Sequence, residues 1–425
     1  MFESIVIGKG LFGAAAARHL SARSAGVAVI GPDEPPDPTT HEGVFASHYD
    51  QGRLQRHLSR DFVWASLSHR SQAEYEGLTR RSGVSFYQPV DSLHLVSGGQ
   101  ESVFLASVAE TARRLGVAYT PVEGGRQLDA PLPMLRFPDG VRGYVEHHPA
   151  GYINPRDLIR AQLRVAEAQG AAVLRETVSS VRDRGDRVAV RTREGNAYEA
   201  RKVLLAMGAY TSAFDALPRK LAMRVKSETI ILARLPAREV ERLRGMPSMI
   251  YEVNAPPVDT LYMLPPILYP DGEYYLKMGC NTAFDRYPST ADEMNRWVRS
   301  GDSDGAKEAM AAIMREVIPG LEATSFGTKR CLISYTADVW PYVDRVAERI
   351  FVATGGNGMG AKSSDAIGKL AAELVFRGEW ADELDPTYFR AVFEGDEAAP
   401  TEWGSCGMAK PARARRPDAA QEAAQ

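Results

Sequence analysis

The chain has 425 residues, of which 44% are hydrophobic and 25% are charged, and its formal net charge at pH 7 is -3. This length has room for two domains and a large core, and the near-neutral charge gives no reason to expect nucleic acid as a partner. No apolar run approaches a membrane span and the first predicted strand begins at residue 2, so we expect no leader, no membrane association and a cytoplasmic location. The three cysteines are widely spaced, which argues against a disulfide framework, and the eight histidines show no metal-ligand spacing.

Residues 2–30 read as a strand, a glycine turn, a helix and a second strand. Gly8, Gly10 and Gly13 give the G-x-G-x-x-G spacing directly after the strand and before a run of alanines that favours a helix. In such a turn the glycines allow the tight bend, the approach of a pyrophosphate and the packing of helix on strand, while the helix N-terminus offers free amides. The segment therefore predicts a bound dinucleotide, and the alternative is an ordinary glycine turn.

The acidic residue expected at the end of the second strand, where it would bind a ribose hydroxyl, is absent. Gly31 and Pro32 stand there instead. Asp33 or Glu34 could replace it, although acidic residues among prolines also suit a solvated loop. Lys9, inside the glycine triplet, either meets a phosphate or points to solvent.

Two arginines follow in the segment SHYDQGRLQRHLSRD. Arg53 and Arg56 are three residues apart, so on a helical turn both would point to one side. A solvated basic face is the alternative, and without further information it is the commoner case. Residues 61–82 then carry apolar and aromatic positions at helical spacing and end at Gly83, which predicts a helix.

From residue 84 the pattern changes to short apolar or alternating runs and a helical stretch over 101–115, as in a second domain. The chain returns to the first domain near residue 151, where Asn154 before a proline predicts a helix start and Gly170 its end. A hairpin turned at 194–196 follows.

Residues 217–327 form a second excursion, with strand-like runs and a helical stretch over 291–317 that is interrupted by SGDSDG. A strand at 350–353 then leads through the turn TGGNGMG into a helix, which again suits a bound ligand. The glycines of this second turn are Gly355, Gly356, Gly358 and Gly360.

Three separated motifs resemble the D-amino acid oxidase superfamily of flavoproteins and, within it, the branch of monomeric sarcosine oxidase and N-methyltryptophan oxidase. The first is SHYDQGRLQR, which matches a serine-histidine start followed by two arginines. The resemblance implies that Ser47 and His48 bind the flavin, and that Arg53 and Arg56 lie beside the flavin and the substrate.

The second motif is YYLKMGCN, and the third is CLISYTAD with GGNGMGAKSS downstream. The resemblance implies that Lys277 lies over the flavin ring and activates oxygen, that Cys331 is the candidate for covalent flavin, and that Lys362 helps to bind the substrate carboxylate. For Cys331 the alternative is a small buried hydrophobic residue, and for Lys277 a structural role.

Two positions depart from this branch. Asn281 stands where sarcosine oxidase has an active-site histidine, and Ile333 stands where it has a tyrosine over the substrate. Tyr262 falls near the second substrate tyrosine of the family in a loose alignment. We therefore expect a substrate other than sarcosine, a larger or differently substituted amino acid or amine.

The sequence thus predicts an α/β fold, with a Rossmann-like FAD-binding domain and an inserted α+β substrate domain built on an antiparallel sheet. The predicted segments are 1–83, 145–216 and 326–390 for the FAD-binding domain, 84–144 and 217–325 for the substrate domain, and 391–425 for a mobile tail. The expected reaction is the FAD-dependent oxidation of a C–N bond, with hydride transfer to the flavin, hydrolysis of the imine and reduction of oxygen to hydrogen peroxide. The alternatives are a dehydrogenase that uses another electron acceptor and a flavoprotein subunit without turnover of its own.

Overall fold

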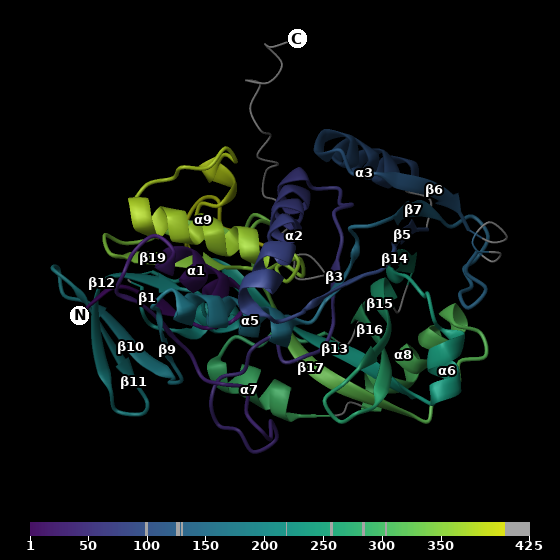
Figure 1. The fold of residues 1–425 in the computed structure, drawn as a ribbon, viewed down its shortest axis with the longest axis horizontal. Helices are drawn as coiled ribbons and strands as arrows, with labels where there is room; N and C mark the ends of the chain where they lie inside the picture. The colour runs from purple at the N-terminus through teal and green to yellow at the C-terminus, as the bar shows by residue number, and fades with distance from the viewer. Residues whose placement is uncertain are drawn as a thin grey trace, which may run out of the picture.

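The structure is a computed structural model in which two sheets lie side by side, with helices packed against them (Figure 1). The residues that it describes are 1–97, 101–124, 128, 131–217, 219–255, 258–282, 285–301 and 304–403. Within these ranges, no helix combines the length and the apolar character needed to cross a membrane.

The first sheet has a parallel centre. Its strands are β1 (Phe2–Ile7), β2 (Val27–Ile30), β9 (Ala172–Leu174), β10 (Val178–Asp183), β11 (Val188–Thr192), β12 (Ala197–Leu205), β18 (Tyr342–Arg345) and β19 (Ile350–Thr354). β1 pairs in parallel with β12 and β2, β2 with β9, and β12 with β19, while β10 and β11 extend the sheet as a hairpin. Strands covered on both faces read as continuous apolar runs, and the last four residues of β1 are all buried.

Four helices pack around the first sheet. They are α1 (Leu11–Ser21), α2 (Phe62–Ser82), α5 (Pro155–Ala168) and α9 (Ser364–Arg377). α2 begins where the side chain of Asp61 accepts a hydrogen bond from the Trp64 amide, and it ends at Gly83 with φ 67°. The Asn154 side chain caps α5 in the same way. These helix bounds confirm the predictions from sequence.

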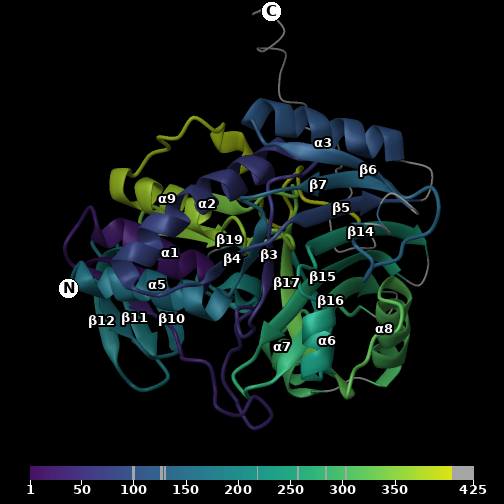
Figure 2. The same ribbon diagram turned by 45° about the vertical axis from the view of Figure 1, so that its right-hand side comes forward.

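The second sheet has several longer strands and is almost wholly antiparallel. Its strands, in spatial order, are β17 (Ser325–Thr336), β13 (Met223–Leu235), β16 (Tyr274–Thr282), β15 (Val258–Leu268), β14 (Ser248–Ala255), β5 (Ser92–Val96), β7 (Arg142–Glu146) and β6 (Tyr119–Glu123). Only β14 and β5 pair in parallel among these described strands. Figure 2 shows α3 (Glu101–Leu115) along β6 and β7, and α6 (Ala237–Arg242) and α8 (Asp304–Val317) beside β15 and β16.

The remaining described elements are shorter. They are the strands β3 (Arg53–Gln55), β4 (Tyr87–Pro89) and β8 (Gly151–Ile153), the helix α7 (Ala291–Arg299) and the 3-10 helices η1 (Gly208–Ala213) and η2 (Pro386–Tyr388). β8 pairs with both β3 and β4. The predicted helical turn at Arg53 and Arg56 is therefore wrong, because this segment starts as an extended strand paired with a segment about one hundred residues away.

The predicted domain segments can be compared with the sheets at residue 326. β17 lies in the second sheet, whereas the prediction places residues from 326 on in the FAD-binding domain. At the start of the predicted tail, Ala391 and Val392 are buried and Phe393 forms a bridge with Leu221. The rest of the predicted tail, 404–425, lies outside the described residues. The division into two domains stays a prediction.

Candidate active site

The first glycine turn is shaped by close backbone contacts. A Cβ at Gly8, whose φ is 99°, would lie 2.3 Å from the carbonyl oxygen of Ala206, and one at Gly13 would lie 1.7 Å from the carbonyl oxygen of Gly8. By contrast, a Cβ at Gly10 would meet only His48 Nδ1, at 4.0 Å. Gly10 is the N-cap of α1 and provides no side-chain cap. The turn thus leaves an open approach to the first amides of α1, which fits the pyrophosphate of a dinucleotide.

The second glycine turn lies against the first. A Cβ at Gly360 would lie 3.0 Å from Cζ of Phe12, in α1, and 2.9 Å from Cα of Gly356. Gly355 and Gly358 have φ of 83° and 74°. The predicted pair of ligand-binding turns, separated by more than three hundred residues, is therefore adjacent in space.

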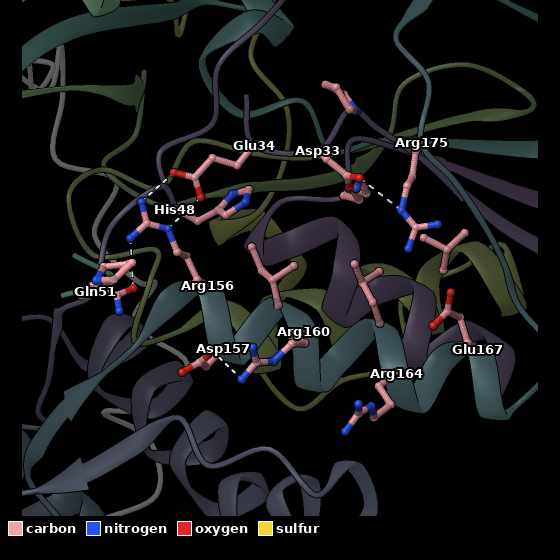
Figure 3. Close-up of a pocket in the computed structure, with 16 residues that line it drawn as sticks. Asp33, Glu34, His48, Gln51, Arg156, Asp157, Arg160, Arg164, Glu167 and Arg175 are labelled. Carbon is pink, nitrogen blue, oxygen red and sulfur yellow. Dashed lines mark hydrogen bonds and ion pairs between the residues drawn. The ribbon is translucent and has the colours of Figure 1, made fainter. Parts of the chain in front are cut away.

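A hollow of about 710 Å³ opens beside the first turn, between the end of β2, α5 and β9 (Figure 3). Asp33 forms ion pairs with Lys9 and with Arg175, the latter at 3.1 Å, and Glu34 pairs with Arg156 at 2.6 Å. Both acidic candidates for the ribose site therefore line this hollow, and each is held by a basic side chain. Lys9 points to Asp33, which neither of its two predicted roles included.

The structure explains why glycine stands at position 31, where a ribose-binding carboxylate was expected. A Cβ there would lie 2.7 Å from the backbone nitrogen and 2.8 Å from Cγ of Lys9. A residue larger than glycine at position 31 would therefore collide with Lys9. The candidate carboxylates instead follow two and three residues later, at Asp33 and Glu34.

Side chains of Ser47 and Arg53, in the segment that follows β2, contact β17. Ser47 Oγ donates a hydrogen bond of 3.1 Å to the carbonyl oxygen of Leu332. Arg53 donates to the carbonyl oxygen of Ser47 at 2.6 Å and lies 4.0 Å from the sulfur of Cys331. Burial raises the pKa of the Cys331 thiol, while the charge of Arg53 opposes that shift. His48 is a neutral imidazole here, because burial and the charge of Arg156 lower its pKa to about 3.

Lys277 lies in a buried charge cluster on the face of the second sheet that is turned away from α8. Its ammonium, fully buried, donates to Asp50 at 2.5 Å and to the carbonyl oxygen of Gly52 at 2.6 Å. Tyr269 donates to the other oxygen of Asp50 at 2.8 Å, and Arg53 also pairs with Asp50. Burial and the charge of Arg53 lower the pKa of Lys277 to about 8, against the opposite effect of Asp50. Asp50 was not predicted from sequence.

Strand register explains why Lys277, Tyr262 and Cys331 share this face. Tyr262 pairs with Gly279, two residues beyond Lys277 on β16, and Cys331 pairs with Glu228 across β13. Side chains two residues apart, and those of paired residues, point to the same side of a sheet. The opposite side carries the apolar core that packs on α8.

Asn281 belongs to a second buried charge cluster. Its Oδ1 accepts a hydrogen bond of 3.1 Å from Lys226, a fully buried lysine that also binds Glu228 at 2.7 Å and Asp285 at 2.8 Å. Ile333 is the strand partner of Lys226. The two positions that depart from sarcosine oxidase are thus neighbours of one ionic network, which sequence reasoning missed because Asn281 and Asp285 reach Lys226 from more than fifty residues away.

Arg56 and Lys362 form a separate pair of buried cations. Arg56 is 5% exposed and Lys362 is 4% exposed, and the ammonium of Lys362 has no hydrogen-bond partner. Burial and the charge of Arg56 lower the pKa of Lys362 to about 7. The charges of Glu146 and Asp61 oppose this shift in the pKa of Lys362, but both carboxylates accept hydrogen bonds elsewhere. Glu146 accepts from the amides and ring of the 57–58 segment, and Asp61 from Trp64 and Trp340. A buried ammonium without a partner is costly and suits an anionic ligand.

The structure therefore groups the predicted site residues into four sets. One set contains Ser47, Arg53, Lys277, Cys331 and Tyr262, and a second contains Arg56 and Lys362. A third contains the two glycine turns with Asp33 and His48, and a fourth contains Asn281 and Ile333 beside Lys226. Their assigned roles remain predictions.

A glycine turn at the carboxyl end of a parallel sheet, with an open helix N-terminus, defines a dinucleotide-binding α/β protein. Residues 3–374 match the FAD dependent oxidoreductase family known as DAO, so the chain belongs to this family. It is an FAD-dependent oxidoreductase, and the predicted resemblance and fold class are confirmed.

Characterised relatives cover most of the chain. It is 28% identical over 398 residues to a monomeric sarcosine oxidase of Streptomyces avermitilis, covering 90% of this chain and 96% of the relative. It is 27% identical over 415 residues to an N-methyl-L-tryptophan oxidase of Escherichia coli, covering 92% and 98%. The solved structure of NikD, an unusual amino acid oxidase, has a TM-score of 0.73 at 18% identity and covers 92% of this chain and 98% of its own.

Proposed function

We propose that this enzyme oxidises the C–N bond of a secondary amine or of an N-substituted or other amino acid, and that oxygen takes the electrons and becomes hydrogen peroxide. The observation that carries the proposal is the unpartnered, buried ammonium of Lys362 beside Arg56. The similarity to sarcosine and N-methyl-L-tryptophan oxidases supports the same class of substrate.

Arg56 and Lys362 would bind the substrate carboxylate. An arginine fork and a lysine point charge compensate a carboxylate in a dry site and also orient it. The same positive charges lower the pKa of a nearby substrate amine, so they favour the neutral amine, which has a lone pair to assist loss of hydride. When bound, FAD supplies the hydride acceptor and the route of electrons to oxygen.

Lys277 would stabilise the negative charge that develops on oxygen as it is reduced. Its ammonium is buried, where an electrostatic interaction is stronger than in water. The hydride step needs no acid or base, and water hydrolyses the imine product. Asn281 and Ile333 change the pocket relative to sarcosine oxidase, so the proposed substrate is larger or differently substituted than sarcosine.

An anaerobic absorbance screen tests the proposal. The purified yellow protein is mixed without oxygen with a panel of secondary and primary amino acids and amines, and the oxidised flavin band is followed. Bleaching by one class identifies the substrate family, and recovery of the band in air with formation of peroxide supports an oxidase. Bleaching without recovery in air would favour a dehydrogenase, and no bleaching by any compound would refute amine oxidation.

A further inference from the structure

Asp50 is the centre of the charge cluster around Lys277. One carboxylate oxygen accepts hydrogen bonds from Lys277 at 2.5 Å and from Arg53. The other accepts from the hydroxyl of Tyr269 at 2.8 Å and from the backbone N–H of Gln51 at 2.8 Å. The side chain is 3% exposed. Burial alone would raise its pKa, but the charges of Lys277 and Arg53 hold it below the usual range, so Asp50 is ionised.

The turn that carries Asp50 is seated directly on the second sheet. A Cβ at Gly52 would lie 2.6 Å from side-chain atoms of both Leu264 and Ile267, so only glycine permits this approach without rearrangement. Leu264 is the strand partner of Lys277. The backbone thus delivers both the Asp50 carboxylate and the Gly52 carbonyl to the same ammonium.

The surroundings of Lys277 would otherwise disfavour its charge. Burial and Arg53 both lower its pKa, and Asp50 is the strongest group that raises it. Several charged or titratable groups surround the Lys277–Asp50 pair. They are Arg53 from β3, Arg156 from α5, Glu228 from β13, Tyr262 from β15, Tyr269 after β15, and Cys331 and Lys329 from β17. Of these, Glu228 already binds Lys226, so Asp50 is the carboxylate that contacts Lys277 directly.

We propose that Asp50 is a positioning residue for the reaction with oxygen, which keeps Lys277 charged and fixes its ammonium in the buried cluster. The inference deepens the proposed function, because it rests on the role of Lys277 in oxygen reduction. In that reaction the reduced cofactor gives two electrons to O₂, which takes up two protons to form hydrogen peroxide, and the cofactor becomes oxidised. Asp50 exchanges no electron or proton in this balance.

The test measures the oxygen reaction without any amine. The flavin of the holoenzyme is reduced anaerobically with light and EDTA, mixed with oxygenated buffer between pH 6 and 9.5, and its reoxidation rate is followed. In the wild type we expect the rate to fall as the pH rises through about 8, where Lys277 loses its proton.

In Asp50→Asn, loss of an opposite charge in contact lowers the pKa of Lys277 by about one to three pH units. We expect the rate at pH 8 to fall at least about fivefold and the break in the profile to move to about pH 7 or lower. Lys277→Met should be slow and without this break, and adding Asp50→Asn to it should cause no further loss. The matched control is Asp271→Asn, an exposed carboxylate of the neighbouring turn, which should keep the wild-type profile.

An unchanged profile in Asp50→Asn would overturn the proposal, as would an equal loss at every pH that persists in the Lys277→Met background. If Asp50→Asn gives no folded holoenzyme, Asp50→Glu decides: a lower rate with the break still near pH 8 supports positioning, and a wild-type rate overturns it. A normal oxygen rate in Lys277→Met would refute the role of Lys277 and this inference with it. Because no amine is used, failure of the amine screen is a separate result.

Discussion

Lys362 is the residue whose surroundings call most directly for a ligand, since its buried ammonium has no partner and Arg56 adds a second charge beside it. In Lys362→Met the carboxylate of the substrate would lose a direct ionic partner at nearly the same side-chain volume. Removing one member of a buried charge pair costs about 2–5 kcal/mol, so we expect kcat/KM for a carboxylate substrate to fall about 30-fold or more.

Steady-state kinetics with a matched pair of amines, one with and one without the carboxylate, measures this effect. At a pH at which the amine is already neutral, the amine without the carboxylate should be oxidised no more slowly by Lys362→Met than by the wild type. Lys369→Met, an exposed lysine in α9, is the control and should leave both substrates unaffected. Equal losses for both amines in Lys362→Met would show that Lys362 does not bind the carboxylate.

Cys331 is the residue that can decide whether FAD is covalently bound. Its sulfur lies 4.0 Å from a guanidinium nitrogen of Arg53, and that positive charge favours the thiolate. We expect the intact mass of the denatured wild type to equal the chain plus FAD, and Cys331→Ser to show the bare chain mass. Cys280→Ser is the control, because Cys280 is buried in the core on the other face of the sheet and should keep the adduct. Free flavin from the denatured wild type would exclude the bond.

At the scale of elements, Asp365 ties three helices over the first sheet together. From α9 it accepts hydrogen bonds from Arg18 of α1 at 2.7 Å and from Gln162 of α5 at 2.6 Å, and it is 1% exposed. Asp365→Ala would leave the buried Arg18 without its closest carboxylate, which costs about 3–5 kcal/mol of unfolding free energy. Urea unfolding measures it, with Glu373→Ala as the control on the same helix.

The control differs in exposure. Glu373 binds Arg23 and Arg377 in a partly exposed cluster, where removal costs about 1 kcal/mol or less. The pH dependence adds a second check. Burial would raise the pKa of Asp365, but His19 and Arg18 hold it below the usual range. Its stabilising effect is therefore present above the unfolded-state pKa of about 3.9 and is lost as the pH falls below it. Similar losses in both variants would refute the special role of Asp365.

Local sequence signals predicted those elements whose determinants are local. The glycine turn, the end of α2 at Gly83 and the start of α5 at Asn154 all depend on signals within a few residues, and the structure has each of them. The segment at Arg53 was predicted wrongly because its conformation is set by pairing with β8, at residues 151–153. Asp50 gave no signal either, since its partners Lys277 and Tyr269 come from segments more than two hundred residues away.

At the scale of the whole molecule, the candidate site is assembled by long-range pairing. Lys277 lies in the second sheet, while Arg53 and Lys362 come from segments beside the first. The family resemblance, and not periodicity, identified these residues together. Neither source indicated the ionic network of Lys226, because a lysine on a strand gives no sign of burial until its partners Glu228 and Asp285 are in place.

The same arrangement predicts that FAD stabilises both sheets together, because its expected contacts include the glycine turn of the first sheet and Cys331 and Lys277 of the second. The variant Cys331→Ser allows this to be measured with flavin that can be removed. A ligand that binds only the folded state adds about 2.7 kcal/mol at one hundred times its Kd, so the melting temperature should rise with FAD concentration.

FMN provides the comparison that locates the effect. It lacks the adenylate half, which the hollow between Asp33 and Arg156 would hold, so at equal concentration it should stabilise Cys331→Ser clearly less than FAD. Near-ultraviolet circular dichroism and intrinsic fluorescence should report one melting transition that moves as a unit, since the ligand would connect residues of both sheets. Equal stabilisation by FMN would argue against an adenylate site in the hollow, and a transition that FAD leaves in place for one probe would argue against a site shared by the two sheets.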